Sequence, residues 1–347
     1  MRRTALFALA LLALTATPSI ADPVEDFYKG KQLRFVIRAA PGGNYDLYMR
    51  LLARHIVRHM PGHPEALPVN MPGGGGLTAL NYTLNVAPHD GTVLTMVTST
   101  APMDQALGYL KAPNIDLRTL QWIGNMSDEN YFLVTSRDSR IATLDDATKR
   151  EVLLAGAGAL DTQQILVAIC NSMLGTKFKS IVGYRTGAEM NLAVERREAD
   201  GRSTTNLPAL FATRPDGAAA FHPLLQAGLE KSPEFKNVPL LRELARTPEQ
   251  KVVFEFLSRA VSPGRPVATN SKAPADRVAA LRRAFDLAIK DPQLLEDAKR
   301  QNLDISPWTG NRLQQVVQEI LDTPAADIAR IKQAIDAGNA DGTRAKK

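Results

Sequence analysis

LRFVIRAAPGGNYDLYMR (residues 33–50) and ALPVNMPGGGGLTAL (residues 66–80) decide the fold of this 347-residue chain. In each stretch an apolar run rich in β-forming residues precedes a glycine loop, and apolar residues at helical spacing follow it. The pattern therefore predicts two successive units of strand, glycine loop and helix. The expected elements are a strand at 33–40, a loop at 41–46, a helix at 47–60, a strand at 66–70, a loop at 72–76, a helix at 77–87 and a third strand at 92–98.

The physics of these units points to an anion. The first backbone N–H groups of a helix have no partner within the helix, and that end carries partial positive charge. Glycines before the helix let the backbone approach a ligand closely, and parallel strands bring both helix N-termini to one edge of the sheet. The candidate anion-binding residues are Gly42, Gly43, Asn44, Tyr45 and Asp46 in the first loop and Gly74, Gly75, Gly76 and Leu77 in the second. Within this set we expect Asp46 to cap and orient its loop, and Tyr45 either to line the pocket or to pack.

Three motifs carry a family resemblance. They are PGGNYD at 41–46, NMPGGGGLTA at 70–79 and APHDGTVL at 87–94. They resemble the patterns PGGxxD, NxPGAGG and APxDGYTL of the Bug family, the periplasmic substrate-binding proteins of tripartite tricarboxylate transporters. The resemblance continues downstream over nearly the whole chain after its N-terminal segment.

The resemblance implies an α/β protein with two lobes (a Venus flytrap), a mainly parallel sheet in each lobe and a ligand cleft between them. It implies a non-enzymatic periplasmic protein that captures a small carboxylate for membrane transporter subunits. No cofactor and no metal are expected, and we expect a monomer. The proposed division is a first lobe at 22–102 plus 250–347 and a second lobe at 103–249.

The second lobe departs from the family pattern. The family carries GxGSPxH where this chain has Gly156-Ala-Gly158, with Asp161 and Gln164 at the Ser and His positions. Tyr184-Arg185-Thr186-Gly187 resembles the family's PY+G motif, and residues 200–205 correspond to its apolar VDVMFDS strand. From the resemblance we expect six residues of this lobe to contact the ligand: Gly158, Thr162, Tyr184, Thr186, Arg202 and Thr204.

Arg202 has three open interpretations, because an unpaired arginine in a buried strand is costly. It pairs with an acid such as Asp200 or Glu198, it reaches solvent, or it clamps a ligand carboxylate with its planar fork.

Residues 1–21 are typical of a signal peptide. Arg2 and Arg3 precede an apolar run, and Ser19-Ile-Ala21 matches a small-x-small cleavage site. We therefore expect export by a Sec signal, cleavage after Ala21 and a mature chain that begins at Asp22. Cys170 is the only cysteine, so the chain can form no internal disulfide bond.

Other chemistries find weaker support. The net charge is +6, but basic and acidic residues alternate along the chain, whereas a nucleic-acid-binding protein gathers basic residues on one face. Residues 156–161 nearly match a dinucleotide fingerprint, yet Asp161 would repel a pyrophosphate and is better interpreted as a helix N-cap. His55, His59 and His63 have zinc-like spacing without an HExxH motif, and a dipole-capping or solvated role suits them better. An exported hydrolase-like enzyme with an unrecognised site, or an orphan ligand-sensing receptor, stays open.

Overall fold

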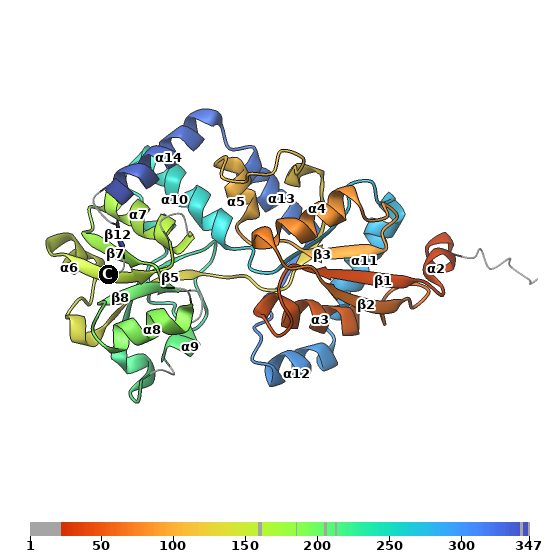
Figure 1. Cartoon of the computed structure of the whole chain (residues 1–347), viewed down its shortest axis with the longest axis horizontal. Coiled ribbons are helices and arrows are strands. Elements are labelled where there is room, and N and C mark those ends of the chain that lie inside the picture. Colours follow the sequence, from red (N-terminus) through yellow and green to blue (C-terminus); the bar gives the residue numbers. More distant parts are fainter. Residues whose placement is uncertain are drawn as a thin grey trace, which may run out of the picture.

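The computed structural model describes residues 22–158, 162–184, 186–204, 207–211, 214–340 and 343–345. These residues form two six-stranded sheets, one in each of two lobes that lie side by side along the long axis of the molecule (Figure 1). Among these described residues, no helix has the length and apolar character that crossing a membrane demands.

The first sheet has the strand order β11-β4-β10-β3-β1-β2. Its strands β1, β2 and β3 are parallel, whereas β10 runs antiparallel to both β3 and β4. The strands are β1 (Gln32–Ile37), β2 (Glu65–Asn70), β3 (Val93–Met96), β4 (Gln121–Asn125), β10 (Pro266–Thr269) and β11 (Trp308–Thr309). The first-lobe helices are α2 (Pro23–Tyr28), α3 (Asn44–Ile56), α4 (Leu77–Asn85), α5 (Ala101–Ala106), α11 (Ala275–Ala288), α12 (Pro292–Arg300) and α13 (Gly310–Leu321).

Helices cover both faces of this sheet, which explains why the end of β1, residues 35–37, is apolar and buried on both faces. Leu33, Phe35 and Ile37 pack into the cluster that contains α3, α11 and α12. Val36 points to the other face, where it packs with Ala79 of α4. A strand buried on both faces is apolar at every position rather than at alternate ones. The sequence therefore located this strand, although β1 ends three residues before the predicted boundary at residue 40.

The second sheet has the order β12-β7-β6-β8-β5-β9, with parallel strands at its core and antiparallel β5 and β9 at one side. Its strands are β5 (Tyr131–Ser136), β6 (Val152–Gly156), β7 (Phe178–Val182), β8 (Gly201–Thr204), β9 (Phe221–Ala227) and β12 (Thr343–Ala345). Its helices are α6 (Leu144–Lys149), α7 (Thr162–Leu174), α8 (Gly187–Glu195) and α9 (Leu207–Phe211). The helices α10 (Pro248–Val261) and α14 (Ala325–Ala340) pack against α7.

From the sequence, residues 208–229, with Pro215 and Pro223 as breaks, are expected to form loop and helix, whereas the structure has β9 there. Pro223 lies inside this strand, and proline removes a backbone donor from a sheet. The strand is nevertheless possible because β9 is the edge of the sheet, where one row of backbone groups needs no strand partner. Because proline lacks a backbone N–H donor, it argues against a strand in the sequence, and for the same reason a strand that contains it lies at the edge of a sheet.

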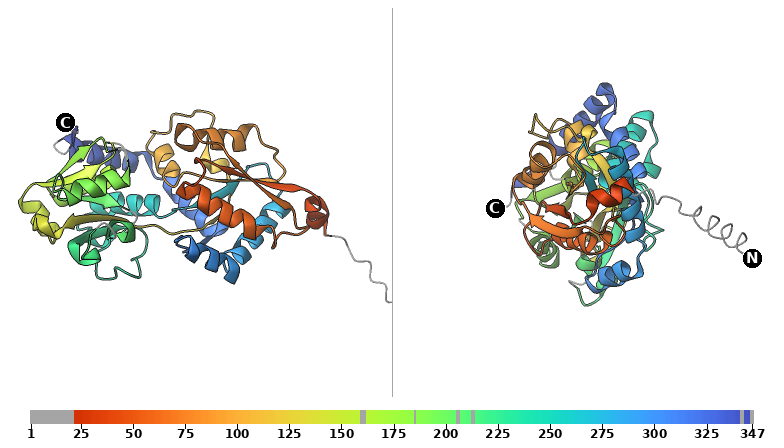
Figure 2. Two further views of the ribbon diagram at one scale, coloured as in Figure 1. Left: turned by 60° about the horizontal axis from the view of Figure 1, so that its bottom comes forward. Right: turned by 90° about the vertical axis from the view of Figure 1, so that its right-hand side faces the viewer.

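The chain passes between the lobes three times: after β4, after α10 and after α13 (Figures 1 and 2). The first two passages bond to each other, because Glu129 N donates to Ser262 O at 2.9 Å and Gly264 N donates to Ser127 O at 3.0 Å. The guanidinium of Arg265 and the carboxylate of Glu129 also form an ion pair at 2.7 Å. We call these residues the hinge.

The structure distributes helices and strands between the two lobes differently from the division proposed from the sequence, which has its boundaries at residues 103 and 250. β4, at residues 121–125, belongs to the first sheet, and α10 and α14 pack against α7 of the second lobe. A single apolar cluster runs from Trp122 through these helices to Leu154. Sequence position alone could not assign these elements, because their apolar faces suit either lobe.

Candidate ligand-binding site

The first glycine loop and the second lie at the carboxyl ends of β1 and β2, where α3 and α4 begin. Gly43 is the N-cap of α3, and Leu77 is the first residue of α4. Four successive glycines, 73 to 76, all have positive φ values, of 136°, 53°, 65° and 107°. Only glycine adopts such a run without steric cost, so the sequence GGGG is a requirement of this backbone path.

Asp46 holds the first loop in place. Its carboxylate accepts from Gly42 N at 2.9 Å, from Asn70 Nδ2 at 2.8 Å and from Arg50 Nε at 2.8 Å, and the residue is 3% exposed. Burial pushes the pKa of Asp46 upward, but the hydrogen bonds from Asn70, Gly42 and Arg50 outweigh it and hold the pKa below 3.8. Asp46 therefore stays ionised and orients its loop, which is the role expected from the sequence.

Arg38 and Thr98 hold the second loop. Arg38 Nη2 donates to the carbonyl oxygen of Gly75 at 2.6 Å, and Thr98 Oγ1 donates to the same oxygen at 2.9 Å. A Cβ atom on Gly76 would stand 2.4 Å from Arg38 Nε, whereas a Cβ on Gly75 would meet nothing within 4 Å. The two loops are thus joined through the ends of β1 and β3.

Tyr45 lies between two guanidinium groups. Arg38 stacks on its ring at 4.3 Å and Arg265 at 4.9 Å, and its hydroxyl accepts from Ser99 N at 3.1 Å. The ring therefore packs, and its contact with a ligand stays a prediction. Sequence reasoning missed Arg38, although a charged residue at the end of an apolar strand and just before a glycine loop was the available signal.

The second-lobe candidates lie at the carboxyl ends of β6, β7 and β8. Gly158 follows β6, and Thr162 is the first residue of α7 and is buried. Tyr184 N donates to Gly156 O at 3.3 Å, and Thr186 caps α8 by accepting from Glu189 N at 3.1 Å. Burial raises the pKa of the Tyr184 hydroxyl, with a smaller contribution from Glu198. Contacts of these residues with a ligand remain predictions.

Arg202 is buried on β8, with 5% of the residue exposed, so it is not a solvated arginine. Its Nη1 donates to Gly187 O at 2.7 Å and to Asn191 Oδ1 at 2.6 Å. Of the two acids considered from the sequence, Asp200 accepts from Leu153 N at 2.8 Å. Thr204, at the end of the same strand, is 4% exposed. A ligand-clamping role for Arg202 stays a prediction beside this structural one.

Gln164 in the first turn of α7 has a buried amide nitrogen, Nε2, that finds no hydrogen-bond partner among the described residues. The residue is 2% exposed, and a Cβ atom on Gly156 would stand 2.1 Å from this nitrogen. Gly156 therefore leaves the space that the amide occupies. The other residues of this loop and of the neighbouring motifs that the sequence singled out, Asp161, Arg185 and Thr205, lie outside the described residues.

His55 and His59 face carboxylates of α12 and of its N-cap. His55 Nε2 lies 2.9 Å from Asp297 Oδ2, and His59 Nε2 lies 3.1 Å from Asp291 Oδ2. No cluster of three potential metal-ligating side chains occurs in the part of the chain that the structure describes. Cys170 is fully buried in α7, and burial raises the pKa of its thiol. A thiol in that position lacks the access and the ionisation of a nucleophile.

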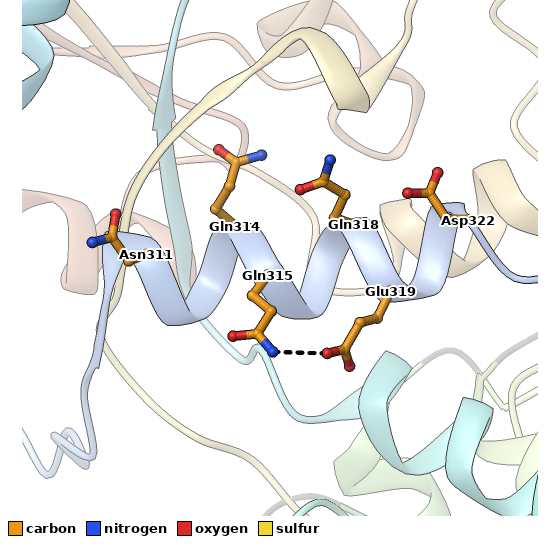
Figure 3. A pocket seen from close by; sticks show the side chains of 6 residues that line it. All are labelled: Asn311, Gln314, Gln315, Gln318, Glu319 and Asp322. Atoms are coloured by element: carbon orange, nitrogen blue, oxygen red, sulfur yellow. Dashed lines mark hydrogen bonds between the residues drawn. The ribbon is translucent and has the colours of Figure 1, made fainter.

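A groove of about 500 Å³ lies along α13, and no residue of the glycine loops lines it (Figure 3). Its side chains are amides and two carboxylates, and one hydrogen bond joins Gln315 and Glu319 at 2.9 Å. The lining residues are Asn311, Gln314, Gln315, Gln318, Glu319 and Asp322. Because this lining includes two acids and no cation, it does not suit a carboxylate.

No protein-family model matches the chain. Protein BugT of Bordetella pertussis is 29% identical over 184 residues, which are 51% of this chain and 52% of that protein. The chain thus matches about half the length of this curated relative.

Among solved structures, a TctC solute-binding protein from Polaromonas has a TM-score of 0.70, with 19% identity over 89% of this chain and 99% of that one. The periplasmic binding protein BugD has a TM-score of 0.61, with 16% identity over 91% and 100%. MatC from Rhodopseudomonas palustris, solved with bound malate, has a TM-score of 0.57, with 17% identity over 88% and 99%. These structures share the two-lobe α/β fold. In its motifs, its sequence match to BugT and its fold, the chain is similar to proteins of the Bug/TctC family.

Proposed function

We propose that this protein is a periplasmic solute-binding protein that captures a small carboxylate between its lobes without changing it chemically. The observation that carries the proposal is the pair of glycine loops at one sheet edge. Four left-handed glycines and two helix N-termini are fixed there by Asp46, Arg38 and Thr98. Backbone N–H groups held in such an arrangement bind an anion without the cost of ordering a flexible loop.

The loops bind the carboxylate through the backbone around Gly42 to Asn44 and around Gly75 to Leu77. Each helix N-terminus contributes about 0.3–1 kcal/mol, so two ends supply a preference for negative charge rather than the full affinity. The rest comes from closure of the second lobe, with residues such as Thr162 and Tyr184 meeting the ligand. The malate bound in MatC supports this choice of ligand class.

The partners belong to the same proposal. After export and cleavage behind Ala21, the protein delivers its ligand, as a monomer, to membrane transporter subunits. Service as an orphan ligand-sensing receptor is the second candidate. N-terminal sequencing of protein from a periplasmic extract should begin at Asp22, and an intact Met1 in the cytoplasm would contradict the periplasmic location.

A thermal-shift screen of C4–C6 di- and tricarboxylates and aromatic acids tests the proposal, followed by recovery of the best ligand by chromatography. At a ligand concentration of about 100 times Kd, binding adds about 2.7 kcal/mol to stability. For lobes of this size that raises Tm by roughly 5–10 °C. A screen without any shift would contradict carboxylate binding, and a chemically altered ligand would reveal an enzyme.

Gly75→Val tests the glycine loop, with Gly30→Val as its matched control. Both glycines have positive φ, 65° and 71°, and a Cβ at either meets nothing within 4 Å, so both variants carry similar backbone strain. Gly30 lies at the remote start of β1. We expect Gly75→Val to abolish the ligand-induced shift and Gly30→Val to retain it. An equal ligand-induced shift in both variants would show that the glycine loop is only a turn and does not bind the ligand.

A further inference from the structure

Two arginines stack on the ring of Tyr45, and they differ in whether a carboxylate neutralises their charge. Arg265 forms an ion pair with Glu129 at 2.7 Å, and the two side chains are only 9% and 16% exposed. Its charge is therefore neutralised inside the hinge. Arg38 takes part in none of the ion pairs of the described residues. Beside the glycine loops, it is thus a cation without a carboxylate partner in the described part of the chain.

The guanidinium of Arg38 is held in place without being saturated. Its Nη2 donates to Gly75 O, and its plane lies on Tyr45. Its Nε is buried and has no partner, and the absence of a Cβ on Gly76 leaves room for this part of the side chain. A fixed guanidinium with unused donors loses little conformational freedom when it meets a carboxylate.

We infer that Arg38 contacts the bound ligand and makes the site selective for dianionic carboxylates over their singly charged analogues. This inference rests on the proposed function and names its ligand class. The backbone groups of the two loops are neutral donors, and they offer enough partners for one carboxylate. The full positive charge beside them compensates a second negative charge, and its planar fork suits a second carboxylate.

The experiment is isothermal titration of malate and succinate, each beside its monoamide, against wild type and Arg38→Met. The monoamide keeps the shape and one carboxylate and lacks the second charge. We expect wild type to bind the diacid at least 10-fold more tightly than the monoamide. Arg38→Met should lower affinity for the diacid by 10–100-fold and for the monoamide by no more than about 3-fold, because the charged contact is then missing only from the diacid complex.

Two further variants separate a direct contact from positioning of the second loop. Arg38→Lys keeps the charge and should retain part of the preference for the diacid. Thr98→Val removes the other donor to Gly75 O, so its effect measures loop positioning and should be equal for diacid and monoamide. If Arg38→Met also weakens both ligands equally, Arg38 acts only through the loop, and the inference is wrong.

Arg34→Met is the control for net charge. Arg34 lies on β1, four residues or about 13 Å from Arg38, which follows the end of that strand, and it donates to the hydroxyl of Tyr82. It should leave the preference unchanged. Wild-type protein that binds monoamides as tightly as diacids would overturn this inference and leave the proposed function intact. Wild-type protein that binds none of the screened carboxylates would overturn both.

Discussion

The two lobes build their halves of the candidate site from different materials. In the first lobe, left-handed glycines are fixed by the charged side chains of Asp46 and Arg38 at the edge of the sheet. In the second lobe, Arg202 is buried against α8, and the side chain beside the β6 loop is the neutral Gln164. The difference suggests a division of labour in which the first lobe recognises charge and the second recognises the remainder of the ligand.

The largest expected effect is at Asp46. Asp46→Ala should lower the free energy of unfolding by about 3–5 kcal/mol, because it removes a buried charged acceptor of three hydrogen bonds, from Gly42 N, Asn70 and Arg50. Chemical denaturation measures this loss. Asp46→Asn keeps one acceptor oxygen and loses the charge, so it should lose less than Asp46→Ala. No measurable loss in Asp46→Asn would show that the charge is unimportant.

The same carboxylate gives a pH dependence. Because the folded state lowers the pKa of Asp46, its stabilisation is complete above the unfolded value near 3.8 and is lost as pH falls through the lower folded value. Denaturation curves between pH 5 and pH 2 should therefore be less steeply dependent on acid in Asp46→Asn. An unchanged slope would contradict the hydrogen-bonded geometry.

Arg202 tests the second lobe. Arg202→Met should destabilise the ligand-free protein by about 2–4 kcal/mol, because Gly187 O and Asn191 lose a charged donor inside the lobe. If Arg202 instead clamps the ligand, affinity falls by about 1.5–3 kcal/mol while the ligand-free protein stays near wild-type stability. Melting curves and titrations on one preparation separate these outcomes.

Alanine at a matched glycine in each lobe compares how rigidly the loops are built. Gly76→Ala should lower the free energy of unfolding by about 2–3 kcal/mol. The new side chain must adopt a positive φ of 107°, and its Cβ would clash with Arg38 and Thr98. Gly156→Ala meets only the movable end of Gln164, so we expect about 1 kcal/mol. Equal losses would mean that the second-lobe loop is as rigid as the first.

The smallest effect has the opposite sign. Gln164→Met removes a buried amide that has no partner, so the ligand-free protein should gain about 1 kcal/mol of stability. If the amide serves the ligand, affinity should fall in the same variant. Differential scanning calorimetry with and without ligand measures both changes, and a loss of stability would contradict the unpartnered state of Nε2.

The sequence indicated the local geometry of the first lobe's loops better than that of the second lobe's loops. Its signals are local there, since a strand, a glycine loop and a helix follow one another directly, and Asp46 lies four residues from the Gly42 amide that it holds. Arg38 escaped notice because its partner Gly75 is 37 residues away and the contact exists only after β1 and β2 have paired. The partners of Arg202 likewise come from α8, through tertiary packing.

For a related reason, the sequence revealed neither the strand β9 nor the lobe in which β4, α10 and α14 lie. A proline is a strong local signal against a strand, and only the position at the sheet edge reverses it. The sequence of an amphipathic helix such as α10 or α14 indicates that one face is buried. It does not indicate which surface of the protein packs against that face.

The three passages of chain between the lobes have a mechanical consequence. A single linker would allow the lobes to bend, twist and slide independently, whereas three passages, two of them bonded together through Glu129 and Ser262, leave bending about one axis as the soft motion. We therefore expect closure to be mainly a bending motion. One pair of spectroscopic labels across the lobes would follow this motion. Cys170 is buried, so labels on introduced surface cysteines would meet no competing accessible thiol.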